Sequence, residues 1–446
     1  NLSECFETNN TVDVSYSDGV SGIKKIQMLG LDGKYIQITS EVIPLIRGMQ
    51  RSYGLSYIPG SWIESIQIIQ GAGSVVNGFE SFTGQINLEY FKPEEGSDKL
   101  NWNVYANSEG KLENNLILTK NNGNWRSNLF THVSYFDEEI DDSGDKFLNM
   151  PRLKQFGLLN RWKYYGSEKY RFQVNLRAIL EERIAGQITT DESITNPYVI
   201  NVDNQIVQVY TKLGKIKSDK RSIGSQTSFT LHNQEAKFGN NIYTGMQESF
   251  SITIVEQNQL NDNHGLKYGG SYFADRFTES FEGNTSSPFL LKKRVDLVTG
   301  LFSEHQYQNE KINIITGLRA DYYNIEEKIY YSPRFNVKYN PGDRTAVRFS
   351  SGRAFRISNI LAENMNFLAS SRNIIIKDNL RTEIGWNYGL NLSHCLYLLN
   401  NEGTLNLDIY RTEFEDQIVI NIENQDELSF ANLNGKSFSN TIQIGL

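Results

Sequence analysis

The histidines are the first candidates for catalysis, because imidazole is the commonest general base and hydrolytic triads pair it with serine. A hydrolase built on neighbouring strands would also need an asparagine or aspartate beside that pair. No matching serine or carboxylate pattern accompanies any histidine of this chain. We therefore expect no enzyme activity and interpret each one as a strand or loop residue: His132, His232, His264, His305 and His394.

Acidic residues form one cluster that could bind a metal ion, in residues 137–145 (DEEIDDSGD). Calcium prefers oxygen ligands, and Asp141, Asp142 and Asp145 lie around a single glycine. Met150 stands where an EF-hand loop would have its bidentate glutamate, so the spacing departs from that motif. We expect a solvated loop here, with a calcium site as the alternative, and we expect no other metal and no cofactor.

Residues 71–78 (GAGSVVNG) are rich in glycine, which invites comparison with a phosphate-binding loop. Such a loop ends in lysine followed by serine or threonine, and this segment does not. Glycine permits positive φ and close approach of two backbones, so the segment predicts a turn. Residues 63–69 and 84–90 on either side are short β-rich runs. The whole stretch therefore predicts two strands joined by a compact turn.

Composition limits the classes of protein to which these 446 residues can belong. The net charge of −8 argues against nucleic-acid binding, which usually needs a basic face. No apolar run approaches the roughly 18 residues of a membrane helix. The 24 tyrosines and 24 phenylalanines suit a membrane β-barrel, where aromatic side chains gather at both interfaces. The only cysteines, Cys5 and Cys395, are far apart and are expected to be unpaired.

From residue 99 onward, apolar and polar residues alternate with the period of two that indicates β-strands. Tight polar turns and mostly longer loops also alternate, which predicts an antiparallel meander of about sixteen strands with two unlike ends. We expect turns at residues 121–124, 165–169, 217–220, 308–311, 340–343 and 400–403, and loops at residues 137–151, 182–204, 278–291, 353–380 and 414–435.

Residues 1–93 differ from this meander, because their strands are short and their apolar residues are too few for an independent core. The meander has a complementary problem, since a face of Asn, Arg, Asp and Gln is costly inside a dry core. Both problems disappear if the polar face lines a lumen that holds the first segment. The pattern thus predicts a small mixed α/β plug, residues 1–93, inside an all-β antiparallel membrane barrel, residues 94–446.

Several segments resemble the TonB-dependent outer-membrane receptors of Gram-negative bacteria. Residues 63–89 are similar to the plug signature of that family, although Gln67 and Gln70 replace its usual Glu and Lys. Residues 25–30 (KIQMLG) and the pair Ile58-Pro59 add to the likeness in the plug, as do residues 332–335, 337–341 and 345–355 in the barrel. On this resemblance, the signature positions are Gly71, Gly73, Ser74, Gly78, Gly84 and Asn87.

The resemblance implies active import of a scarce nutrient, with a ferric siderophore ranked first and cobalamin or another metal complex next. It implies the outer membrane as location, membrane lipid and a small-molecule ligand as partners, and TonB with ExbB and ExbD as energy source. In this family a TonB-binding segment precedes the plug, and the barrels close with about twenty-two strands. We therefore expect this chain to lack both that segment and the last strands. The alternatives are a non-transporting surface receptor or adhesin, and a glycan importer.

Ligand contacts in this family come from the outer loops and the apices of the plug. By position in the chain, those apices are residues 18–22, 31–34 and 48–53. An arginine there offers two parallel donors to an anionic group, and a tyrosine offers a flat amphipathic face. Packing against the barrel wall is the alternative role for these side chains. The predicted ligand-binding residues are Asp32, Lys34, Met49, Gln50, Arg51 and Tyr53.

Overall fold

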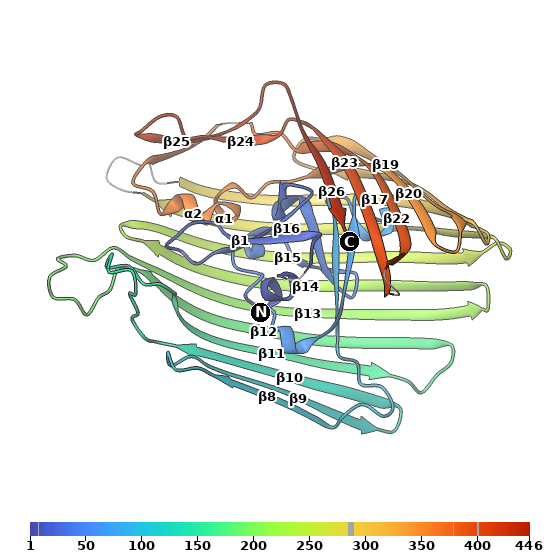
Figure 1. Ribbon diagram of the computed structural model, residues 1–446, viewed down its shortest axis with the longest axis horizontal. Helices are drawn as coiled ribbons and strands as arrows, with labels where there is room; N and C mark the ends of the chain where they lie inside the picture. The colour runs from blue at the N-terminus through green and yellow to red at the C-terminus, as the bar shows by residue number, and fades with distance from the viewer. Residues whose placement is uncertain (8, 284–289, 378, 399–400) are drawn as a thin grey trace.

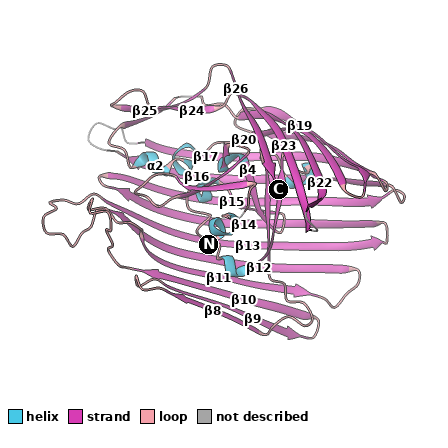
Figure 2. Cartoon of the chain, in the orientation of Figure 1, coloured by secondary structure: helices cyan, strands magenta, loops and turns pink. Residues whose placement is uncertain are grey.

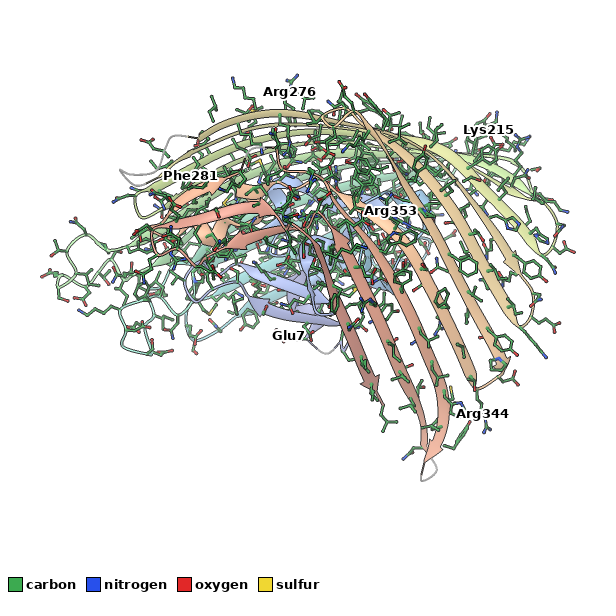
Figure 3. All side chains as sticks on the ribbon, turned by 90° about the horizontal axis from the view of Figure 1, so that it is seen from above. Glu7, Lys215, Arg276, Phe281, Arg344 and Arg353 are labelled. Carbon is green, nitrogen blue, oxygen red and sulfur yellow. The ribbon has the colours of Figure 1, made fainter. Side chains whose placement is uncertain are left out.

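A computed structural model describes residues 1–446 except 8, 284–289, 378 and 399–400. Most of the chain is β-strand, and the helices are short (Figure 2). Sixteen of the strands after residue 99 form one antiparallel sheet, which confirms the predicted meander and its strand number. Figure 3 shows this sheet as an arch that curves around the N-terminal part of the chain, with Glu7 on its concave side.

The large sheet follows chain order, with β8 at one edge and β26 at the other (Figure 1). Alternating residues explain why it forms, because each strand places apolar side chains on one face and polar ones on the other. Its strands are β8 (Leu100–Ala106), β9 (Leu112–Asn122), β10 (Trp125–Phe136), β11 (Arg152–Tyr164), β12 (Tyr170–Gly186), β13 (Val199–Ser218), β14 (Arg221–Phe238), β15 (Asn241–Gln259), β16 (His264–Glu282), β17 (Leu290–Gln308), β18 (Ile312–Tyr323), β19 (Lys328–Gly342), β20 (Thr345–Arg356), β22 (Glu383–Leu398), β23 (Asn401–Glu415) and β26 (Lys436–Gly445).

The two faces of this sheet have opposite character. On the convex face, Leu301 and Leu318 are 71% and 55% exposed, as expected of side chains that face lipid. On the concave face, Arg161, Arg319 and Asp321 are fully buried. Buried charges need partners, and the N-terminal segment supplies many of them. No helix among the described residues is long and apolar enough to cross a bilayer.

The N-terminal segment contains two small sheets, ordered β1-β2-β3 and β5-β4-β7-β6, and the helical turns among its described residues are all 3-10. β4 and β7 pair in parallel, and β6 and β7 form the predicted pair of strands around the glycine-rich turn. The segment also covers the β26 edge, since Thr441 Oγ1 donates to the Leu29 carbonyl at 2.7 Å. Its elements are η1 (Leu2–Phe6), β1 (Val12–Tyr16), β2 (Lys24–Met28), β3 (Leu31–Asp32), η2 (Gly33–Tyr35), β4 (Ile36–Ser40), β5 (Ile43–Ile46), η3 (Gly48–Arg51), η4 (Gly60–Trp62), β6 (Ile63–Gln70), η5 (Val75–Asn77) and β7 (Gly84–Tyr90).

The connections at the two ends of the large sheet differ as predicted, but several strands are longer than expected. The loop predicted at residues 182–204 shrinks to 187–198, because β12 and β13 continue past the predicted boundaries. The loops that follow β20 and β23 carry structure of their own: α1 (Ile360–Glu363), α2 (Met365–Leu368), β21 (Asn373–Ile376), β24 (Ile418–Asn421) and β25 (Glu427–Asn432). The centre of the predicted 278–291 loop and the start of the predicted 400–403 turn lie outside the described residues.

Candidate functional site

A cavity of about 570 Å³ lies between the N-terminal segment and the first strands of the large sheet. We call it the loop-end cavity, because it is bounded by the loop side of β8 to β12 and by residues 148–151 of the following loop. From the N-terminal segment it is lined by residues of the 16–24 turn and of the stretch 52–61. Its size falls in the range of small-molecule sites, which makes it the first candidate for a ligand.

The turn at 16–24 is held by its own aspartate. Asp18 accepts hydrogen bonds from the backbone N–H groups of Val20 and Ser21, at 2.8 and 2.6 Å, and from the Ser17 hydroxyl at 2.6 Å. Burial raises the pKa of the Asp18 carboxyl, but these donors outweigh it and leave the pKa below its ordinary value. The turn therefore presents a charged group whose oxygens are already satisfied.

The wall of the cavity contains a polar network built around His132. Its Nδ1 lies 2.8 Å from Asn115 Oδ1, and its Nε2 lies 3.1 Å from Gln155 Oε1. Gln155 Nε2 in turn donates to Glu181 at 2.6 Å, and Glu181 pairs with Arg183 at 3.4 Å. These bonds hold the imidazole in the wall between two amides, and no serine is among its hydrogen-bond partners in the described part of the chain.

The predicted ligand-binding residues do not share one open surface. Met49 is fully buried and Gln50 is 4% exposed, while Tyr53 is 2% exposed but borders the loop-end cavity. Arg51 donates to the carbonyls of Gly33 and Ile36, at 3.2 and 3.0 Å. The side chain of Asp32 caps η2 by accepting from the Lys34 N–H at 2.9 Å, and Lys34 lies over the Tyr35 ring. Ligand contact by these six residues stays a prediction.

The reason for this burial is the loop after β20, which descends onto the N-terminal segment. Ser52 Oγ donates to the Ala362 carbonyl in α1 at 2.7 Å. Met49, Tyr53 and Tyr57 share one hydrophobic cluster with α1, α2 and the loop-side ends of several strands. Sequence alternation could not indicate this contact, because it joins two segments about three hundred residues apart along the chain.

A charged chain continues from this loop into the barrel wall. Arg356 donates to Glu363 of α1 at 2.6 Å and also pairs with Glu383 at the start of β22. The Tyr35 hydroxyl of the N-terminal segment donates to Glu383 at 2.9 Å and accepts from Gln417 at 3.0 Å. The end of β20, the start of β22, the segment around Tyr35 and the loop at Gln417 thus meet around the buried Glu383 carboxylate. Movement of one of these segments would disturb the others.

The glycine-rich turn contacts the concave face of β17 to β20. Arg334 donates to the carbonyls of Gly73, Ser74 and Gly78, at 3.1, 2.7 and 2.9 Å. Ser74 also donates to Glu304 at 2.5 Å. Gly71, at φ +78°, lies where a β-carbon would come within 2.8 Å of Ser350 Oγ. This close approach requires glycine, so the turn is shaped to the wall.

The other two signature positions hold the small sheet together. A β-carbon on Gly84 would lie 2.3 Å from the Ile69 carbonyl oxygen, so a larger residue cannot fit between β6 and β7. The Asn87 side chain accepts from the Thr39 hydroxyl at 2.9 Å and from the Val42 N–H at 2.7 Å. Both positions therefore act on the shape of the N-terminal segment and not on a ligand surface.

Two sets of buried ion pairs join the N-terminal segment to the wall, and no local sequence pattern indicated either of them. Arg47 bridges Glu80 and Asp275, at 3.0 Å each. Glu41 pairs with Arg161 and Lys212 of β11 and β13. Burial raises the pKa of both glutamates, but the guanidinium groups outweigh it and hold each pKa below its ordinary value.

The acidic loop is held by its own backbone. Asp141 accepts from the N–H groups of Gly144 and Lys146, at 2.7 and 2.8 Å, and Asp145 accepts from the Phe147 N–H at 2.9 Å. Asp142 accepts from the Asn149 amide at 3.0 Å. Within the described residues there is no group of three His, Cys, Asp or Glu side chains placed to hold a metal. The solvated loop stays the prediction here, with calcium binding by these aspartates as the alternative.

Comparisons with known proteins point in one direction. The profile of the family described as "TonB dependent receptor-like, beta-barrel" matches residues 71–444. The FrpB iron transporter from Neisseria meningitidis has a TM-score of 0.69 and 13% identity, covering 97% of this chain and 72% of that one. The copper transporter OprC has a TM-score of 0.75 and 13% identity, with 97% and 71% covered.

A third solved structure, a mutant of the ferric enterobactin receptor PfeA from Pseudomonas aeruginosa, has a TM-score of 0.73 and 12% identity. The match covers 99% of this chain and 74% of the PfeA chain. At these identities the likeness concerns the fold. A search of curated protein sequences gives no match.

Proposed function

The chain belongs to the TonB-dependent receptor family, and from that premise we propose that it imports a ferric siderophore across the outer membrane of a Gram-negative bacterium. Cobalamin or another metal complex ranks next. In this proposal residues 1–93 are the plug and residues 94–446 form the wall. The ligand arrives at the end of the barrel that carries the long loops, and the protein transports it without chemical change.

The observation that carries this proposal is the fit of the plug into the concave face of the sheet. Trp62 is fully buried, with its ring 5.7 Å from that of Phe130 on the wall. Buried ion pairs at Glu41 and Arg47 and the Arg334 contacts hold the plug on two further sides. A plug fixed in this way obstructs passive diffusion, so passage of a solute needs work on the plug.

The family supplies a source for that work. TonB, driven by ExbB and ExbD and the proton gradient of the inner membrane, would supply it by pulling on the plug. The chain of contacts from α1 through Glu383 to Tyr35 supports coupling between the outer loops and the plug. Ligand that displaces α1 would expose Met49 and Tyr53 and weaken the plug contact made by Ser52.

The names of structural neighbours support a metal complex as cargo. They include an iron transporter, a copper transporter and a ferric enterobactin receptor, and each of those cargoes belongs to its own protein. Iron chelates rank first here because two of these three names concern iron.

The test is uptake of radioactive iron by cells that depend on this protein as their only receptor. We expect siderophore-bound iron to enter when TonB is present and uptake to fall to background when TonB is deleted. Uptake that survives the deletion would remove TonB-dependent import from consideration. Ligand binding without any uptake in either strain would favour the non-transporting receptor or adhesin.

A further inference from the structure

The loops that border the loop-end cavity are strongly acidic. Residues 137–151 and 187–198 together contain eight carboxylates and one lysine. They connect β10 to β11 and β12 to β13, and they project together beyond the strand ends in Figure 1. Residues 416–435, at the same end of the sheet, add four carboxylates and no basic residue. A solute that approaches this end therefore meets a negative potential.

The first two loops are bound to each other, and we call them the acidic rim. Glu139 accepts from the backbone N–H groups of Thr189 and Thr190, at 2.9 and 3.1 Å. Lys146, the only lysine of the rim, pairs with Asp191 at 3.4 Å. These bonds fix the two loops as one surface. Arg152 and Lys154 at the start of β11 also pair with Asp137, and Arg152 with Glu139. Eight carboxylates then face three cations, so the rim stays negative.

Inside the cavity the cations are paired, and Asp18 adds a carboxylate that has hydrogen-bond donors but no cation among its described partners. Each lysine and arginine that lines it in the described part of the chain has a carboxylate partner. Lys24 pairs with Glu4 at 3.1 Å, Lys111 with Glu113 at 2.8 Å, and Arg183 with Glu181 at 3.4 Å. An anionic ligand that entered would lose water without gaining a free cation, which is unfavourable.

The remaining lining suits a ligand that makes hydrogen bonds and apolar contacts. Tyr16 is 62% exposed, and the amide of Asn103 is exposed as well. Tyrosine offers an apolar face with a polar tip, and amides both donate and accept. Such groups recognise carbonyl and amide groups of an uncharged chelate.

We propose that the loop-end cavity receives metal chelates of neutral or positive net charge and disfavours strongly anionic ones. The class it fits is the ferric trihydroxamates, and the class it disfavours is the trianionic ferric tris-catecholates. This rests on the proposed import of a metal chelate and specifies the chemistry of that ligand. The acidic rim disfavours anionic chelates during approach, and the lack of a free cation in the described cavity lining disfavours them after entry.

The experiment measures equilibrium binding to the purified chain in detergent micelles, by quenching of tryptophan fluorescence. The probes are a neutral ferric trihydroxamate, a monocationic one and a ferric tris-catecholate. We expect both trihydroxamates to bind more tightly than the tris-catecholate, by on the order of tenfold at low salt. Raising the salt concentration should narrow the gap, because exposed charges are screened. Equal or tighter binding of the tris-catecholate would overturn the proposal.

Two pairs of variants separate the rim from the cavity. The double variant Glu138→Lys with Glu192→Lys reverses two exposed rim charges. It should bring the affinity for the tris-catecholate closer to the affinity for the neutral probe. Glu310→Lys, at an exposed position on the opposite end of the sheet, is the matched control and should leave the affinities for all three probes unchanged. Asn103→Trp should fill the cavity and lower the affinity for the neutral probe at least about tenfold. Val104→Trp, on the other face of the same strand, should leave binding intact.

If Asn103→Trp binds the neutral probe as well as Val104→Trp does, the ligand lies elsewhere and the proposal is wrong. If the rim variant changes no affinity, the rim does not select by charge and the proposal is wrong in that part. These measurements use no TonB. They can therefore fail while TonB-dependent uptake holds, and they can succeed when uptake does not depend on TonB.

Discussion

Glu41 offers the sharpest test of how the plug is held in the wall. Its side chain is 4% exposed and pairs with Arg161, which is fully buried, and with Lys212 at 3.3 Å. Gln173 also donates to it at 2.7 Å. In Glu41→Gln the side chain keeps its size but loses its charge. Arg161 then remains buried without a counter-charge.

Breaking a buried ion pair by removing one partner typically costs 3–5 kcal/mol, and an amide oxygen can still accept from Arg161, so we expect about 3 kcal/mol. That free energy should appear as easier release of the plug from the wall. Trp62 reports this release, because it is fully buried and its ring lies 5.7 Å from that of Phe130 on the wall. Urea titration of its fluorescence gives the midpoint, with Trp62→Phe as the background.

Glu7→Gln is the control, since Glu7 is exposed on the concave side of the arch (Figure 3). The double variant Glu41→Gln with Arg161→Met should be less destabilised than the sum of the two single variants, because no charge is left unpaired. If Glu41→Gln releases its plug at the same urea concentration as Glu7→Gln, the ion pair does not hold the plug.

The same carboxylate predicts a dependence on pH. The pKa of Glu41 is depressed in the folded protein, so its contribution is fully present above the pKa of the unfolded chain. It is lost as the pH falls through the folded pKa. Plug release should therefore become easier on acidification in the wild type, and this part of the change should be absent in Glu41→Gln.

Three further substitutions test other parts of the structure. Arg334→Ala removes three donors to the glycine-rich turn and should cost about 2 kcal/mol or more, measured as faster protease cleavage within residues 71–78 than in the wild type. Met365→Ala empties a fully buried position in α2 and should cost about 3 kcal/mol, seen as faster hydrogen exchange over residues 357–368; unchanged exchange would contradict the packing of this loop on the plug. Gly84→Ala places a β-carbon 2.3 Å from a carbonyl oxygen and should prevent normal plug folding, whereas Gly403→Ala, with open space around it, should be neutral by circular dichroism and urea titration.

The large sheet could be predicted from the sequence because the rule that makes it is local. Alternation in residues 100–107 assigns each side chain to a face without knowledge of the neighbouring strand. Turn residues such as those at 165–169 then fix where the chain reverses. The same rule failed at the strand ends near residues 182–204, where strands continue outside the alternating pattern because neighbouring strands still offer hydrogen-bond partners.

The candidate site could be predicted only in part. The glycine-rich turn was recognisable, since Gly71 and Gly84 are required by backbone geometry that the residue type itself reveals. The burial of Met49 and Tyr53 was not, because it depends on a loop that returns from α1 to cover them. Position along the chain predicts an apex of the plug at residues 48–53, but it could not indicate what packs against those residues.

The sequence by itself determined the strands, their faces, the unlike ends of the sheet and the acidic character of the long loops, because each of these follows from neighbouring residues. The tertiary structure alone decided that Glu41 meets Arg161, that Arg47 meets Asp275, and that a cavity with paired lysines and arginines opens beside the acidic rim. Those contacts depend on how the plug docks into the curved sheet. Docking joins residues more than a hundred positions apart, and no local pattern records their distance.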